Sequence, residues 1–112
     1  MDIQELRREA QTMQPQLTAD RRRLHRNPEA GAVLPETVAY VKERLTEMGY
    51  HPQELGGGLT ATVTGTDTGR CILLRADMDA LPLREHPENL KGPRVCVSEQ
   101  ENTCHACGHD AH

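Results

Sequence analysis

The sequence predicts an α/β or α+β layer fold, and three observations carry this prediction. Two helical patterns occupy the first half of the chain, alternating and continuous apolar runs follow them, and metal-seeking side chains gather at the end. The length of 112 residues allows one domain. Because the chain has no Phe and no Trp, its core must be built from smaller apolar side chains and is expected to be thin.

The first helical pattern starts at Ile3. Apolar residues recur at steps of three, four and seven with charged residues between them, which is typical of an amphipathic helix; they are Ile3, Leu6, Ala10, Met13, Leu17 and Leu24. Pro15 has no N–H to donate, so we expect it to kink or divide the helix near Gln14. The Asn27-Pro28 pair is expected to end it.

A second helix is expected to start around Pro35, because proline is favoured in a first turn, and to end at Gly49. Its apolar face is formed by Val38, Val41, Leu45 and Met48. This spacing predicts a helix that packs one face against the rest of the chain.

The chain beyond the second helix predicts a hairpin that leads into a buried strand. Leu59, Ala61 and Val63 alternate with threonines, "GTDTG" at residues 65–69 is expected to turn the chain, and residues 71–74 form a continuous apolar run. Residues 82–103 show weak periodicity and predict a long loop with one short strand at residues 95–97.

Charge and hydropathy exclude two classes of partner. The formal net charge is -4, and the one basic cluster, which includes Arg21 and Arg26, stands beside acidic residues without interleaved aromatic residues. Such a cluster is typical of a solvated helix face, so we expect no nucleic-acid partner. No apolar run has the pattern of a signal peptide or the length of a membrane span, so we expect a cytoplasmic protein without membrane contact.

Two aspartates follow the predicted buried strand. Asp77 and Asp79 are two residues apart, so their side chains lie on the same side of an extended segment. Carboxylates at the carboxyl end of a central strand face the crevice where α/β proteins bind ligands. Taken alone, this feature favours the simpler interpretation that the aspartates form a turn ahead of Pro82.

The last nine residues, "CHACGHDAH", combine thiols, imidazoles and a carboxylate. Only Gly108 separates Cys107 from His109, so both could reach one cation if the glycine adopts an unusual turn. His105, Asp110 and His112 are candidate further ligands or orienting groups. The alternative is a surface tail that binds metal adventitiously.

Cysteine spacing leaves one further alternative open. Cys104 and Cys107 form a C-x-x-C, but Gly108 stands where covalent haem attachment requires histidine, and the motif does not open a helix after a first strand as in thioredoxin-like proteins. The alternative function is therefore a small structural or regulatory metal-binding module, with Cys104, Cys107, His109 and His112 as its closed site.

Five segments together resemble the co-catalytic di-metal amidohydrolases, a family that includes hippurate hydrolase, N-acyl-amino-acid amidohydrolase and plant auxin-conjugate hydrolases. They are "RRRLHRNPEAG", "PETVAYVKERLTEMGY", "GGGLTATVTG", "ILLRADMDALPLRE" and "HACGHDAH". The resemblance implies that residues 1–112 are the truncated N-terminal part of a zinc-peptidase-like, three-layer catalytic domain. The sheet would be incomplete, and the lid or dimerisation domain would be absent.

The resemblance also implies roles for individual residues. Cys107 and His109 match two metal ligands, with the Cys107 thiolate shared between or nearest to two divalent metals, which could be Zn, Mn, Co or Ni. Asp79 falls where relatives place an aspartate that orients a ligand, and Asp77 where the carboxypeptidase branch has a histidine ligand. Cys104 stands where relatives usually carry methionine, which makes it a bystander.

The implied reaction is hydrolysis of the amide bond of a small N-acyl amino acid or a related amide. The family's paired glutamates and two further histidine ligands lie downstream of the matching motif, so we expect the isolated chain to be catalytically inactive. Strand edges left without neighbours could also lead the chain to self-associate.

Overall fold

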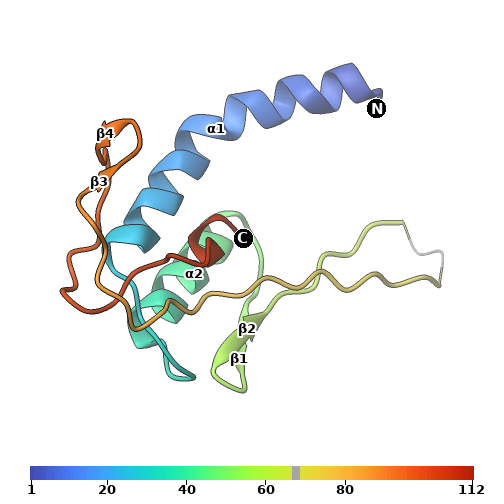
Figure 1. The fold of residues 1–112 in the computed structure, drawn as a ribbon. Helices are drawn as coiled ribbons and strands as arrows, with labels where there is room; N and C mark the ends of the chain where they lie inside the picture. Colours follow the sequence, from blue (N-terminus) through green and yellow to red (C-terminus); the bar gives the residue numbers. More distant parts are fainter. Residues whose placement is uncertain (67–68) are drawn as a thin grey trace.

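The computed structural model describes residues 1–66 and 69–112. Two helices come first, two small antiparallel hairpins follow, and a single 3-10 turn lies at the end of the chain (Figure 1). In chain order the elements are α1 (Ile3–Arg26), α2 (Pro35–Glu47), β1 (Gln53–Leu55), β2 (Gly58–Thr60), β3 (Glu88–Asn89), β4 (Gly92–Pro93) and η1 (His109–Ala111).

Helix α1 begins and ends where local signals require. The Asp2 side chain accepts a hydrogen bond from the backbone N–H of Glu5 at 2.8 Å and caps the first turn. The helix continues through Pro15 as one element, and Figure 1 shows that its two halves run in different directions, so of the two expected outcomes the helix is bent and not divided. It ends at Arg26 with Asn27 as its cap, which confirms the predicted stop.

Only the C-terminal end of α1 is packed. The predicted apolar stripe lies on the helix, but its N-terminal members are exposed, with Ile3 81% exposed and Leu6, Met13 and Leu17 each more than half exposed. His25, near the other end, is buried. Most of this helix therefore extends beyond the body of the molecule (Figure 1).

Helix α2 begins at Pro35 as predicted and ends at Glu47, two residues before Gly49. Its cap residue, Leu34, has no side-chain oxygen, and Glu29 supplies one instead. The Glu29 carboxylate accepts from the N–H of Thr37 at 2.6 Å and from the N–H of Glu36 at 3.2 Å. A carboxylate at this end is favourable because the first N–H groups of a helix have no partner within it.

A polar cluster joins the two helices. Asp20 of α1 accepts hydrogen bonds from the Tyr40 hydroxyl at 2.6 Å and from Arg44 Nε at 3.0 Å, both in α2. Burial alone raises the pKa of Asp20, but hydrogen bonds from Tyr40, Gln16 and Arg44 outweigh it and leave that pKa lowered. Burial and the hydrogen bond to Asp20 raise the pKa of Tyr40 to about 12.

The first hairpin forms earlier in the chain than predicted. Strand β1 pairs with β2 in the register Leu55↔Gly58, and the turn between them is Gly56-Gly57. Both glycines have positive φ, 57° and 85°, as a two-residue hairpin turn requires. The sequence predicted that the segments before and after residues 65–69 would pair as strands. In the described residues neither segment is a strand, and residues 67–68 of the predicted turn lie outside the described residues.

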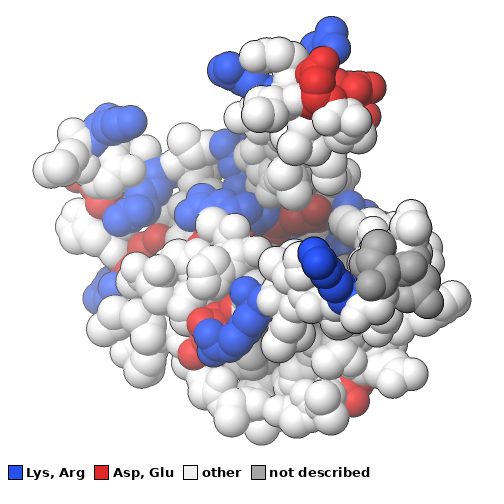
Figure 2. Space-filling view, turned by 90° about the vertical axis from the view of Figure 1, so that its right-hand side faces the viewer, with Lys and Arg blue, Asp and Glu red and all other residues white. Residues whose placement is uncertain are grey.

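The predicted buried strand at residues 71–74 is wrong. These residues belong to no strand, and Ile72, Leu73 and Leu74 are 86%, 90% and 90% exposed. We call residues 61–66 and 69–76 the arm; Figure 1 shows it as extended chain reaching away from the helices, and Figure 2, viewed from that side, shows mostly uncharged atoms in front. A continuous apolar run indicates burial, but in the described chain no neighbouring strand covers it.

Residues 82–103 contain a hairpin that was not predicted. Strand β3 pairs with β4 through the register Asn89↔Gly92. The expected short strand at residues 95–97 is wrong: these residues are in no strand, and Val95 is exposed.

Two isolated bridges connect the middle of the chain to its end. Ala80 pairs in parallel with Ala30, and Leu81 pairs with Cys104, with N–H···O distances of 3.0 Å in both directions. Among the described residues, the buried hydrophobic side chains are those of Leu34, Ala80 and Cys104, so the core is as thin as the composition predicted. Within the described residues, no helix has both the length and the apolar character to cross a membrane.

Candidate metal centre

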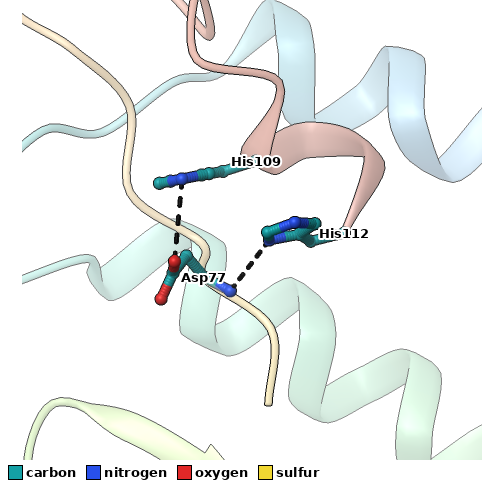
Figure 3. A group of neighbouring side chains, drawn as sticks. All are labelled: Asp77, His109 and His112. Carbon is teal, nitrogen blue, oxygen red and sulfur yellow. Dashed lines mark hydrogen bonds and ion pairs between the residues drawn. The ribbon is translucent and has the colours of Figure 1, made fainter. Parts of the chain in front are cut away.

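The Asp77–Asp79 segment and the C-terminal segment meet beside helix α2 (Figure 3). Leu81 pairs with Cys104, which sets the two segments side by side a few residues from each functional group. Gly108 has φ 89° and ψ 10°, in the left-handed region that side chains rarely adopt. The unusual turn that the sequence required between Cys107 and His109 is therefore present.

Asp79 holds the His109 ring. Nδ1 of His109 lies 3.0 Å from Asp79 Oδ1 and 3.0 Å from the Asp79 backbone oxygen. Both oxygens only accept, so Nδ1 donates and the lone pair of the neutral ring is on Nε2. A histidine whose Nδ1–H is held by a carboxylate is the usual arrangement behind a metal-binding Nε2.

Cys107 contacts the same backbone carbonyl oxygen. Its exposed Sγ is 3.7 Å from the Asp79 oxygen, so thiol and imidazole both flank Asp79. A thiolate and an imidazole suit zinc and similar divalent metals, and this donor pair therefore fits such an ion chemically. The arrangement brings the three predicted site residues together without testing what each of them does.

Three further contacts place Asp77 beside two histidines (Figure 3). Asp77 Oδ2 lies 3.7 Å from His109 Nε2, and the Asp77 N–H donates to His112 Nδ1 at 3.3 Å. The rings of His109 and His112 stack with centroids 5.3 Å apart and an interplanar angle of 15°. One potential ligand atom from each of Asp77, His109 and His112 lies within 4.8 Å of the others.

In the described part of the chain, the four side chains of the alternative module are not gathered into one group. Asp77, His109 and His112 are the one group of three or more such side chains within the described residues, and neither cysteine belongs to it. Cys104 is buried, and its backbone is bonded to Leu81. Cys104 and Cys107 therefore occupy different environments.

A buried network that the sequence did not reveal fixes the position of η1. His25 Nδ1 lies 2.7 Å from Asp110 Oδ2, and His25 Nε2 lies 2.7 Å from Glu85 Oε1. Arg21 Nε is 2.9 Å from the same oxygen of Asp110. Asp110, a candidate ligand by sequence, is instead bound to helix α1. No spacing rule connects residues 25 and 110, so only the fold could show this contact.

His105 is buried, and neither of its ring nitrogens has a hydrogen-bond partner among the residues that the structure describes. Burial lowers the pKa of His105, and the nearby Asp110 carboxylate partly opposes this effect. The ring faces a cavity of about 440 Å³ with apolar walls that include Leu24, Val41 and Leu59, and His109 and His112 line the same cavity.

The mixed α/β scaffold thus brings thiol, imidazole and carboxylate groups together where two segments meet, and this donor set suits a divalent metal ion. No family model matches the chain. It is, however, 40% identical over 103 residues to the N-acetyl-L-cysteine deacetylase of Bacillus subtilis. This match covers 90% of the present chain and 24% of the deacetylase. It is 42% identical over 94 residues to the hippurate hydrolase of Campylobacter jejuni, covering 82% and 23% respectively.

A solved structure gives the same result. A dinuclear metal-binding peptidase of the M20 family from Bacillus subtilis superimposes with a TM-score of 0.77 at 34% identity, over 89% of this chain and 28% of that one. The chain is thus similar to part of a deacetylase, of a hippurate hydrolase and of a dinuclear metal-binding peptidase of the M20 family, which confirms the resemblance and the fold class. It spans about a quarter of the length of these relatives.

Proposed function

We propose that this chain is the N-terminal part of the catalytic domain of a metal-dependent amidohydrolase. The whole enzyme would be cytoplasmic and would hydrolyse the amide bond of small N-acyl amino acids or related amides. The curated relatives named above are a deacetylase and a hydrolase of such compounds, which supports this substrate class. The observation that carries the proposal is the Asp79 carboxylate bonded to His109 Nδ1, because it orders a metal-binding imidazole at the family's motif.

In this proposal Cys107 and His109 would hold metal, and Asp79 would orient His109. Two bound divalent metals would acidify a water and polarise the scissile carbonyl. The chain's own contribution is positional: Asp79 fixes the tautomer and tilt of the His109 ring, and Gly108 lets the thiol and the ring flank one carbonyl. By itself the chain would be catalytically silent, because the family's general base and further ligands belong to the segment downstream of this motif.

A chimera tests this function. Residues 1–112 would replace the homologous quarter of the Bacillus subtilis deacetylase, and hydrolysis of N-acetyl amino acids and hippurate would be measured with added Zn²⁺, Mn²⁺, Co²⁺ or Ni²⁺. We expect metal-dependent hydrolysis by the chimera and none by the isolated chain. His109→Ala should abolish activity, and Asp79→Asn should lower it about 10- to 100-fold.

The matched control is His51→Gln, which changes an exposed histidine outside the metal centre and should leave activity unchanged. A folded, metal-loaded chimera without activity would contradict the proposed function. Activity in the isolated chain, with host amidohydrolase excluded, would contradict its expected silence.

A further inference from the structure

We propose that this chain, by itself, binds one divalent transition metal through Asp77, His109 and His112, in a site that does not use the Cys107 thiolate. The proposal does not depend on the amidohydrolase function, because it concerns only residues within this chain. It begins from the group of three side chains drawn in Figure 3, whose potential ligand atoms lie within 4.8 Å of one another.

The spacing of the ligand atoms is close to what a metal requires. Metal–ligand bonds of about 2 Å in tetrahedral geometry set neighbouring ligand atoms about 3.3 Å apart. Asp77 Oδ2 and His109 Nε2 are already 3.7 Å apart. Since no two ligand atoms of the group are more than 4.8 Å apart, shortening each separation by at most about 1.5 Å would bring the set to this spacing.

The other polar atoms of two ligands are already engaged, so their free atoms face the shared space. His109 Nδ1 donates to Asp79, which leaves the Nε2 lone pair toward Asp77. Asp77 Oδ1 pairs with Arg75 Nη2 at 2.5 Å, which leaves Oδ2 toward His109. This arrangement favours one oxygen of Asp77 and one nitrogen of His109 as ligands.

His112 offers Nδ1 to the same space. This nitrogen accepts the Asp77 N–H at 3.3 Å, which is long for a hydrogen bond and therefore weak enough to be exchanged for a metal bond. The bond also shows that the unprotonated nitrogen of His112 already faces Asp77.

The two histidines are brought together by the 3-10 turn. His109 and His112 are three residues apart, and a 3-10 helix has three residues per turn, so their side chains eclipse. The rings accordingly stack at 15°. Asp110, between them, is bonded to His25 of α1, which fixes the turn to the body of the protein. The pair is therefore ordered before any metal arrives.

The donor set defines the ligand class. Two imidazoles and one carboxylate suit Zn²⁺, Co²⁺ and Ni²⁺, and water would fill the remaining position. Cys107 is exposed, lies against the Asp79 carbonyl and does not belong to this group. The proposed site and the Cys107–His109 pair share His109, so one chain would use one arrangement at a time for that ligand.

Calorimetric titration of the purified chain with Zn²⁺, under reducing conditions, tests the site. We expect one Zn²⁺ per chain. His112→Gln and Asp77→Asn should each weaken binding at least tenfold, whereas Cys107→Ser should change affinity less than twofold. His51→Gln, in an exposed histidine away from the site, is the matched control and should have no effect.

A second measurement needs no variant and so does not depend on how the variants fold. On addition of Zn²⁺, the ring nitrogen signals of His109 and His112 should shift in NMR spectra, and those of His51 should not. Loss of binding in Cys107→Ser with unchanged binding in His112→Gln, unshifted His112 signals, or no Zn²⁺ binding at all would overturn the proposal. Because the isolated chain is used, these outcomes are separate from failure of the chimera.

Discussion

The C-terminal segment and the arm differ in burial, and composition alone would have predicted the opposite assignment, with the arm buried and the C-terminal segment exposed. The C-terminal segment is polar, yet His105 and Asp110 are buried in it. Asp110 is bonded to His25 of α1, and the same histidine ring also contacts Glu85. The arm contains the continuous apolar run of residues 71–74, yet Leu73 and Leu74 are 90% exposed. Burial follows the partners available within the chain, and hydrophobicity alone does not ensure it.

The most disruptive change should be His25→Gln. It removes a ring that lies between two carboxylates, and it leaves the buried Asp110 and the half-buried Glu85 with fewer partners. We expect the free energy of unfolding in urea to fall by about 3 kcal/mol. His51→Gln, at an exposed position, should change it by less than about 0.5 kcal/mol. Equal effects of the two changes would show that the network does not anchor the C-terminal segment.

Hydrogen exchange should separate the two regions without mutation. The amides of Ala80, Leu81 and Cys104 donate to backbone oxygens at 2.7 to 3.0 Å, whereas Ile72 and Leu73 lie in extended, exposed chain. We expect exchange at the bridge to be at least tenfold slower than in the arm. Equal protection of the arm would mean that it is covered, for example by a second copy of the chain.

The contact between α1 and α2 should weaken in acid. The lowered pKa of Asp20 means that its ionised form stabilises the fold; this contribution is present above the unfolded pKa of about 4 and is lost as pH falls through the folded pKa. Asp20→Asn should cost about 1 kcal/mol at neutral pH. It should also reduce the loss of stability between about pH 5 and pH 2, measured by thermal unfolding. An unchanged acid profile would contradict this role.

The smallest effect on stability should come from the arm. Leu73→Ser changes a side chain that is 90% exposed, so the free energy of unfolding should shift by less than about 0.5 kcal/mol. If the arm causes the proposed self-association, sedimentation should show fewer oligomers for this variant than for the parent chain. An unchanged distribution of oligomers would place any self-association elsewhere.

Local signals in the sequence predicted much of the fold. Asn27 ended α1 and Pro35 began α2 because these residues act on the backbone next to them. Gly108 took the left-handed turn for the same reason. The prediction of a buried strand was wrong because a strand requires neighbouring strands. The apolar run at residues 71–74 does not specify which segment would pair with it.

The site was predicted in part. Cys107, His109 and Asp79 lie together, and the sequence had marked Asp77 and His112 as candidates nearby. The contact between His25 and Asp110 spans 85 positions and follows no periodicity, so no sequence pattern could have indicated it. The structure defines where Cys107 and Asp79 lie. Their roles, as a metal ligand and as the group that orients His109, stay predictions.

The tautomer of His109 tests most directly whether the C-terminal segment meets the Asp79 carboxylate. In metal-free chain at about pH 8, where an ordinary histidine is neutral, nitrogen NMR should show the proton of His109 on Nδ1, held by Asp79. In Asp79→Asn the amide oxygen can still accept, so Asp79→Ala is the sharper variant and should release that proton to Nε2. A parent chain with the His109 proton on Nε2, as in an unrestrained histidine, would contradict the account.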